Sequence, residues 1–173
     1  MFFAVLVSSL ALAIGFAIYD LTARQLLLAS ITTQSQYAIY AADSGAECAL
    51  YWDAKYNGTN DGTNSPPYNG TNSAFATSSV WSGPPSLPAG LFCSGQDITS
   101  NGAGYNVVIS GAFATTTFTI KMAAAVPESS CATVEVGKYI NANNVLFTTV
   151  VSHGYNTCAP GASRIERLLY VSY

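Results

Sequence analysis

The chain has 173 residues, of which only 9% are charged, and its formal net charge is −3 at pH 7. An average soluble domain has about 25% charged residues, so the exposed surface is expected to be polar but largely uncharged. The six Lys and Arg residues are spread singly, and this pattern excludes the basic surface that specific nucleic-acid binding requires.

The N-terminal segment "MFFAVLVSSLALAIGFAIYD" has no charged residue before Asp20. A signal peptide would have a basic residue ahead of a shorter apolar core. The segment instead predicts a membrane-spanning helix of roughly 20 residues, in which Ser8, Ser9 and Gly15 are small positions for close helix packing. Arg24 follows Asp20 by four positions, which is the spacing of a helical ion pair.

Nothing in the sequence ends this helix before Trp52. The first proline is Pro66, so we expect one helix from Phe2 to about Trp52, roughly 75 Å long. In its second half, the apolar residues Leu27, Ile31, Ala38, Ala42 and Ala49 share one face, and Gln36, Asp43 and Glu47 lie largely opposite. This half is predicted to pack on a globular domain, from which the apolar first half protrudes.

Residues 54–103 have the composition of a loop region. The sequence "YNGTN" occurs twice there, among Asn-Gly and Pro turn signals. Asn57 and Asn69 each match the N-x-[ST] glycosylation pattern, which is common by chance in so Thr-rich a segment. The loop also resembles an EF-hand calcium loop, but Tyr68 occupies the position of the bidentate glutamate, so we expect no metal there.

Residues 104–173 have the composition of β-strands. In "FATTTFTIKM", Thr115, Thr117 and Thr119 alternate with apolar residues, which predicts a strand with one buried face and one solvent-exposed face. The other candidate strands are "GYNVVISG", "ATVEVGKY", "NNVLFTTVVSHG" and "RIERLLYVSY". Short turns between them indicate antiparallel pairing. The predicted fold class is therefore α+β, with one long helix packed on four or five antiparallel strands.

The chain is thus expected to have two parts. Residues 1–24 form the half of the helix that is expected to lie in a membrane. Residues 25–173 form a globular head, with an amphipathic helix at 25–53, the loop region at 54–103 and the sheet at 104–173. A head of this size can bury one modest hydrophobic core.

Four cysteines, Cys48, Cys93, Cys131 and Cys158, are widely spaced in a chain with one histidine. The spacing lacks the ligand pairs of a zinc site, and an even number of cysteines behind an apolar N-terminus is typical of disulfides in an exported protein. Four cysteines allow three connectivities. We favour Cys48 with Cys93 and Cys131 with Cys158, because each pair closes a shorter loop.

The sequence contains no recognisable catalytic set. His153 ends a predicted strand without a GxSxG or HExxH motif, which favours a hydrogen-bonded or solvated residue. Asp43 and Glu47 share a helix face and could hold a cation or act as an acid and base pair. A solvated face, or pairing with Lys or Arg, is the more common arrangement. We therefore expect no enzyme, no cofactor and no metal site.

The apolar N-terminus, the uninterrupted amphipathic extension and the small disulfide-bonded β-domain together resemble the type IV pilins, including the pseudopilins of type II secretion. The resemblance is specific over residues 1–53 and is architectural beyond them. Within it, "YAADSGAECALYWD" is similar to the A-x-x-A-A-[DE]-[ST]-G-x-[DE]-x-A signature of one branch of bacterial pilins. Gly15 also lies about where the family has a glycine.

This resemblance implies that a basic leader is removed, that the new N-terminal residue is methylated, and that subunits leave the inner membrane to stack as a helical surface filament. Pilus assembly machinery would be a further partner, and adhesion, motility, DNA uptake or secretion would be the role. Met1 would be the first mature residue, or else an initiator methionine. The residues implicated in assembly are Met1, Phe2, Val5, Ser8, Ser9, Gly15, Asp20 and Arg24.

Two positions depart from the family pattern. Most pilins have a glutamate at the fifth position, where it neutralises a neighbour's N-terminal amine, and this chain has Val5, as some tip subunits do. Ser8, Ser9 or a backbone carbonyl would then have to accept hydrogen bonds from the buried ammonium, or the amine would be partially neutralised. Many pilins also have a proline where this chain has Thr22.

The alternative interpretation is a single-pass, membrane-anchored surface domain that does not polymerise. Such a domain would use the Tyr- and Asn-rich loops as a binding module.

Overall fold

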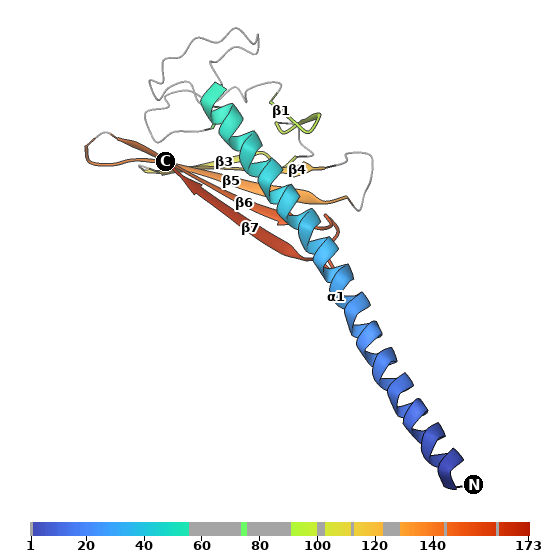
Figure 1. Ribbon diagram of the computed structural model, residues 1–173. Helices are drawn as coiled ribbons and strands as arrows, with labels where there is room; N and C mark the ends of the chain where they lie inside the picture. The colour runs from blue at the N-terminus through green and yellow to red at the C-terminus, as the bar shows by residue number, and fades with distance from the viewer. Residues whose placement is uncertain are drawn as a thin grey trace. The chain divides into compact units, whose positions relative to one another are not determined.

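The computed structural model describes residues 2–55, 74–75, 91–99, 103–111, 113–122, 129–143, 145–161 and 163–173. Met1, the candidate glycosylation sites Asn57 and Asn69, and the calcium-like loop lie outside these residues. The elements in chain order are α1 (Phe2–Lys55), β1 (Phe92–Cys93), β2 (Gln96–Asp97), β3 (Asn106–Ser110), β4 (Phe113–Lys121), β5 (Cys131–Ile140), β6 (Leu146–Tyr155) and β7 (Glu166–Ser172) (Figure 1).

Helix α1 is continuous from Phe2 to Lys55, as expected from the absence of helix-breaking residues. Thr22, at the position where many pilins have proline, keeps the helix intact and donates its hydroxyl to the carbonyl oxygen of Ile18 at 2.8 Å. The chain divides into two compact units, a first unit of Met1–Gln34 and a second unit of Ser35–Tyr173. The division falls ten residues beyond the point where apolar character drops in the sequence.

Strands β3 to β7 form one antiparallel sheet in the order β3-β4-β5-β6-β7. Each strand pairs with its neighbours in the chain, so the sheet is a simple meander. The central strand β5 pairs along its length with β4, from Cys131 opposite Lys121 to Tyr139 opposite Phe113, and with β6 on its other side. The predicted α+β class and the five predicted strand segments are confirmed.

Within the second unit, α1 packs across one face of this sheet (Figure 1). The buried apolar residues of the helix are all alanines, namely Ala38, Ala41, Ala42, Ala46 and Ala49, each at most 3% exposed. Two glycines lie where the helix and the sheet approach each other most closely. A Cβ on Gly45 would lie 2.8 Å from Val134 Cγ2, and a Cβ on Gly154 would overlap the backbone of Ala38 and Ala42. Small residues in the pilin-like signature therefore bring helix and sheet into backbone contact.

Leu27 and Ile31 were expected on the buried helix face, and that expectation is wrong. They are 64% and 46% exposed. Further along the helix, the hydroxyl of Ser35 accepts a hydrogen bond from Arg167 Nε of β7 at 2.9 Å. The apolar periodicity thus continues toward the N-terminus beyond the part of the helix that the sheet covers.

The sheet strands alternate between a helix-facing side and an outer face. The helix-facing side supplies the core, with Phe118, Ile120, Val134, Val136 and Val150 at 1% exposure or less. The outer face carries Thr115, Thr117 and Thr119 of β4, as the alternation predicts, whereas Thr116 is buried on the helix-facing side. It also carries a row of stacked rings across three strands, in which Tyr139 lies 5.4 Å from Phe113 and 5.0 Å from Phe147 between ring centroids.

Candidate functional site

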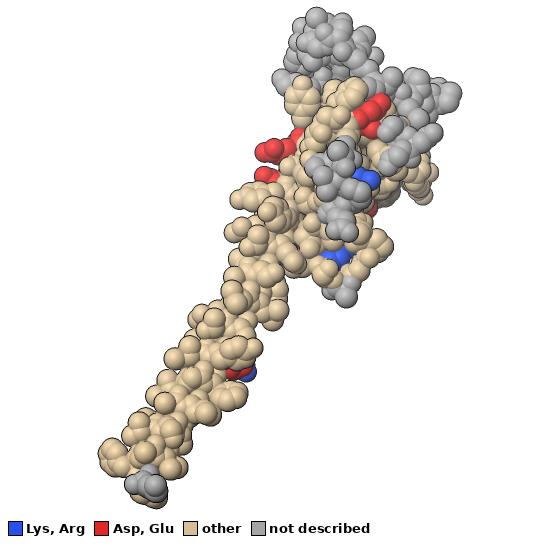
Figure 2. All heavy atoms as spheres, turned by 90° about the vertical axis from the view of Figure 1, so that its right-hand side faces the viewer, with Lys and Arg blue, Asp and Glu red and all other residues tan. Residues whose placement is uncertain are grey.

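The first unit is a helix with apolar side chains on all sides. Figure 2 shows this N-terminal helical part as almost wholly uncharged, apart from one adjacent acid and base. Its exposed large side chains include Phe2, Phe3, Val5, Leu6, Leu10, Leu12, Phe16 and Leu26, each more than half exposed. Within the described chain, α1 is the one helix long enough and apolar enough to cross a membrane. The first unit is therefore the candidate assembly surface.

Five hydroxyl groups of this helix are satisfied by the helix itself. Ser8, Ser9, Thr22, Thr32 and Thr33 donate to carbonyl oxygens three or four residues earlier, at 2.8–3.1 Å. An unsatisfied hydroxyl is costly in apolar surroundings, so these bonds suit a helix that leaves water. The oxygens of Ser8 and Ser9 keep acceptor capacity, which a neighbouring ammonium could use.

The remaining assembly candidates are also exposed. Val5 is 67% exposed, and the structure places no protein atom within 4 Å of a Cβ added to Gly15, so nothing in the described chain requires glycine there. Asp20 Oδ2 and Arg24 Nη2 form the predicted helical ion pair at 3.1 Å. Their side chains are 66% and 76% exposed. An ion pair this exposed contributes only about 0–1 kcal/mol to stability and can exchange partners.

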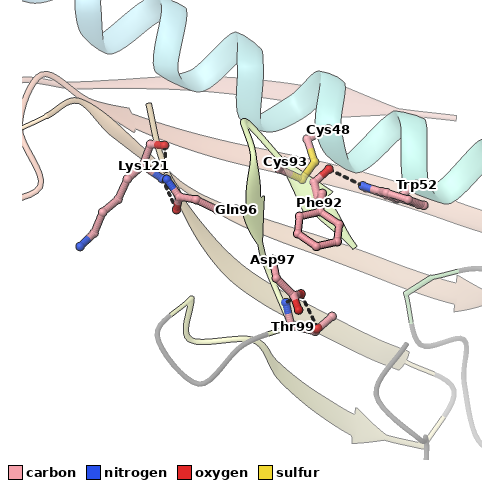
Figure 3. The surroundings of a disulfide bond; sticks show 8 residues. All are labelled: Cys48, Trp52, Phe92, Cys93, Gln96, Asp97, Thr99 and Lys121. Atoms are coloured by element: carbon pink, nitrogen blue, oxygen red, sulfur yellow. Dashed lines mark hydrogen bonds between the residues drawn. A yellow bond between two sulfur atoms is a disulfide. The ribbon is translucent and has the colours of Figure 1, made fainter. Parts of the chain in front are cut away.

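A disulfide joins α1 to the small hairpin of β1 and β2 (Figure 3). It links Cys48 and Cys93, the pair favoured by loop length, and their Cα atoms are 5.9 Å apart. One helical turn later, Trp52 Nε1 donates to the carbonyl oxygen of Phe92 at 3.1 Å. The hairpin was predicted as loop, because strands of two residues are too short to show a periodicity.

Two local features shape the hairpin. Ser94 and Gly95 have φ angles of 50° and 75°, the left-handed conformation of a tight hairpin turn. Gln96 then ties β2 to the end of β4, because its Nε2 donates to the carbonyl oxygen of Lys121 at 2.6 Å (Figure 3). The hairpin is thus held on one side by the helix and on the other by the sheet.

The second predicted cysteine pair, Cys131 and Cys158, is present as two thiols. Cys131 is buried at the start of β5, and Cys158 is partly buried. Burial, followed by the contact with Cys158, raises the pKa of Cys131 to about 12. The Cys158 amide donates to the carbonyl oxygen of Ser129 at 3.0 Å, which holds the two cysteines together. The partners are those predicted, while the bond between them is not formed in this structure.

A buried ion pair, missed in the sequence, connects three parts of the second unit. Lys138 Nζ of β5 contacts Asp53 Oδ1 of the last turns of α1, and the two side chains are only 2% and 4% exposed. The hydroxyl of Tyr173 donates to Asp53 Oδ2 at 2.6 Å. The alternation of β5 could have predicted that Lys138 is buried, because Lys138 falls on the same side of the strand as Val134 and Val136.

His153 lies on the outer sheet face, where its Nδ1 is 2.5 Å from Oε1 of Glu166. This geometry agrees with the expected hydrogen-bonded residue. Nearby, the Arg164 guanidinium lies 3.6 Å from the ring centroid of Tyr155, and burial, then the charge of Glu166, raises the pKa of that tyrosine. Among the described residues, no three His, Cys, Asp or Glu side chains are grouped so that they could hold a metal ion.

Comparison with known proteins identifies no relative: no family model, no curated protein and no solved structure matches this chain.

Proposed function

We propose that this chain is a structural subunit of an extracellular filament of the type IV pilus kind, which polymerises through the first unit of α1. One observation carries the proposal. A helix with exposed apolar side chains on all sides continues, without a break, into a helix that has one face buried on a sheet to whose domain a disulfide joins it.

The physical reason is the cost of apolar surface in water. Soluble monomers rarely expose apolar patches larger than a few hundred Å², and the first unit consists almost entirely of such surface. A bilayer covers it before assembly, and copies of the same helix cover it afterwards. Contacts between different patches of identical subunits do not close into a dimer, and repeated helically they form fibres.

The assembly candidates fit this role. The internally bonded hydroxyls leave the helix without unsatisfied donors at Ser8 and Ser9, and Gly15 offers a small position that has no use within the described chain. Val5 provides no acid for an N-terminal ammonium, so the oxygens of Ser8 and Ser9 are the proposed acceptors.

The second candidate function is a membrane-anchored surface domain that never polymerises. The same apolar helix favours it, because a single span is sufficient to anchor a small head. The two proposals differ in where the mature chain is found. They also differ in the coding sequence upstream, since a short basic leader favours the pilin-like subunit.

The test is to shear surface filaments from cells that express the chain and to identify their subunits by mass spectrometry. We expect the chain in the filament fraction, with a methylated N-terminal residue. An Ile14→Lys variant should be lost from the filaments because it places a charge in the apolar helix, whereas the control Ser110→Lys, on the exposed face of β3, should be incorporated. Recovery of the wild-type chain only from detergent-extracted membranes would establish the anchor instead.

A further inference from the structure

The part of α1 in the second unit has a polar face that the sheet does not touch. Gln36, Tyr40, Asp43, Glu47 and Tyr51 recur at spacings of three or four residues along it and are all exposed. We call this set the acidic stripe. It lies on the side of the helix opposite the buried alanines, and its two tyrosines are 65% and 57% exposed.

The carboxylates of the acidic stripe are in no ion pair of the described residues. The pairs present are Asp20 with Arg24, Asp53 with Lys138, and Glu166 with His153. The described arginines of the second unit are engaged on the sheet, since Arg164 stacks over Tyr155 and Arg167 donates to Ser35. The stripe therefore combines two negative charges with exposed aromatic surface and no described cation of its own.

The complementary group is in the first unit. Arg24 is its single basic residue, and it is surrounded along the helix by apolar side chains such as Leu21, Leu27 and Leu28. Its guanidinium has five N–H donors, of which the exposed contact with Asp20 can use only some. When this part of the helix becomes covered, the guanidinium N–H groups that Asp20 leaves unpaired need acceptors, because a buried donor without a partner is costly.

We propose that the acidic stripe is the docking site for the Arg24 turn of a second copy of this chain. Arg24 of one copy binds Asp43 and Glu47 of the next while it keeps its own Asp20. Tyr40 and Tyr51 pack against the leucines that flank Arg24. This inference rests on the proposed filament function and specifies which surfaces meet in it.

The arrangement is heterologous, because a patch of the first unit in one copy meets a different patch of the second unit in another. Each copy has both patches, so every subunit added leaves a new site for the next one. Such contacts propagate instead of closing into a pair.

The first experiment is cysteine cross-linking in sheared filaments of cells whose only copy of the chain carries the substitutions. Arg24→Cys combined with Glu47→Cys should give a ladder of disulfide-linked multimers on non-reducing gels. The matched control combines Arg24→Cys with Glu135→Cys, which lies exposed on the outer face of the sheet, and should give no ladder.

The second experiment removes the charges singly and together. Arg24→Gln should lower the filament yield several-fold, and Asp43→Asn with Glu47→Gln should lower it to a similar extent. The filament yield of the variant with all three substitutions should be no lower than that of Arg24→Gln alone or of the Asp43→Asn, Glu47→Gln variant, because all three residues act in one contact. Asp20→Asn, which removes only the partner within the same chain, should retain most of the yield.

The outcomes separate the two proposals. Filaments that contain the chain but show no ladder and no effect of the charge removals would overturn the docking site and leave the filament function standing. Cross-linking of the stripe to a different protein would also overturn it. Absence of the wild-type chain from filaments would overturn the filament function, and the docking site with it.

Discussion

At the scale of single residues, the contact between helix and sheet depends on the absence of side chains. Gly154 of β6 faces the backbone of Ala38 and Ala42, and Gly45 of the helix faces Val134. Neither glycine has a positive φ, so the requirement at both positions is for space and not for backbone conformation. Packing of the helix against the sheet therefore explains the glycine at position 45.

The first prediction concerns Gly154→Ala. The added methyl group would overlap backbone atoms of α1, so the helix must move away from the sheet. We expect the free energy of unfolding to fall by about 3 kcal/mol or more, at or beyond the upper end for overpacked cores. Urea denaturation of the detergent-solubilised chain measures this. Gly161→Ala is the control, because a Cβ there meets no atom within 4 Å, and an equal loss in both variants would contradict the explanation.

The second prediction concerns pH and Cys131 in the dithiol form. Its pKa is raised from 9.0 to about 12, so the folded state keeps its proton in a range where the unfolded chain has lost it. The stabilisation is therefore complete below about pH 9 and is lost as the pH rises toward 12. Denaturation series across this range should show the decline in the wild-type dithiol.

The same series on Cys131→Ala should lack that decline, because the titrating group is gone. A chain oxidised to the predicted Cys131–Cys158 disulfide should lack it as well, and peptide mapping without reductant identifies that form. An undiminished decline in Cys131→Ala would assign the effect to another group, such as Tyr155, whose pKa is also raised.

At the scale of elements, α1 is one helix with two different environments. In the second unit it is attached to the sheet at both ends of the contact, by Ser35 with Arg167 near the start and by Asp53 with Lys138 and Tyr173 near the end. Between these polar contacts lie the buried alanines, and Cys48 joins the helix to the β1–β2 hairpin. The helix is thus positioned by directional contacts as well as by apolar burial.

The third prediction tests the contact at the end of the helix. Lys138→Met removes the cation that contacts the buried Asp53 carboxylate, and we expect a loss of about 3–5 kcal/mol in the free energy of unfolding. Combining it with Asp53→Leu should restore much of that loss, since no buried charge remains. Denaturant unfolding of both variants provides the measurement. If the double variant is as unstable as Lys138→Met, the ion pair stabilises the fold by more than the neutralisation of one buried charge by the other.

At the scale of the whole molecule, burial is confined to the second unit. All described buried residues, from Ala38 onward, belong to Ser35–Tyr173. The first unit has none of its own in the described structure and is available to a membrane or to other copies. The hydrophobic core of the head is therefore complete, among the described residues, without any residue of the first unit.

The fourth prediction follows from this separation. A chain that begins at Ser35 should be soluble without detergent, keep the Cys48–Cys93 disulfide, and unfold within about 0.5 kcal/mol of the full chain, as expected for a change away from the core. Circular dichroism and urea denaturation of both chains test it. A fragment that fails to fold would show that the first unit contributes to the head.

Sequence reasoning predicted most of the fold because the relevant signals are local. The missing helix breakers, the alternation in "FATTTFTIKM" and the turn residues between strands are each contained within a few neighbouring positions. The Asp20–Arg24 pair and the Cys48–Cys93 bond were predicted from spacing. These features hold in the structure because helix and strand periodicities depend on consecutive residues.

Contacts between distant segments were decided only by the tertiary structure. The helical period puts Leu27, Ile31 and Ala38 on one face of the helix. Only Ala38 is buried, because the sheet covers only part of that face. Lys138 and Asp53 meet because β5 and the end of α1 pack together, and Cys131 acquires its raised pKa from burial beside Cys158. The sequence by itself determined one long helix and five antiparallel strands, through local periodicity. The tertiary structure decided which face is covered, which charges are paired and which side chains remain exposed, because burial depends on residues far apart in the chain.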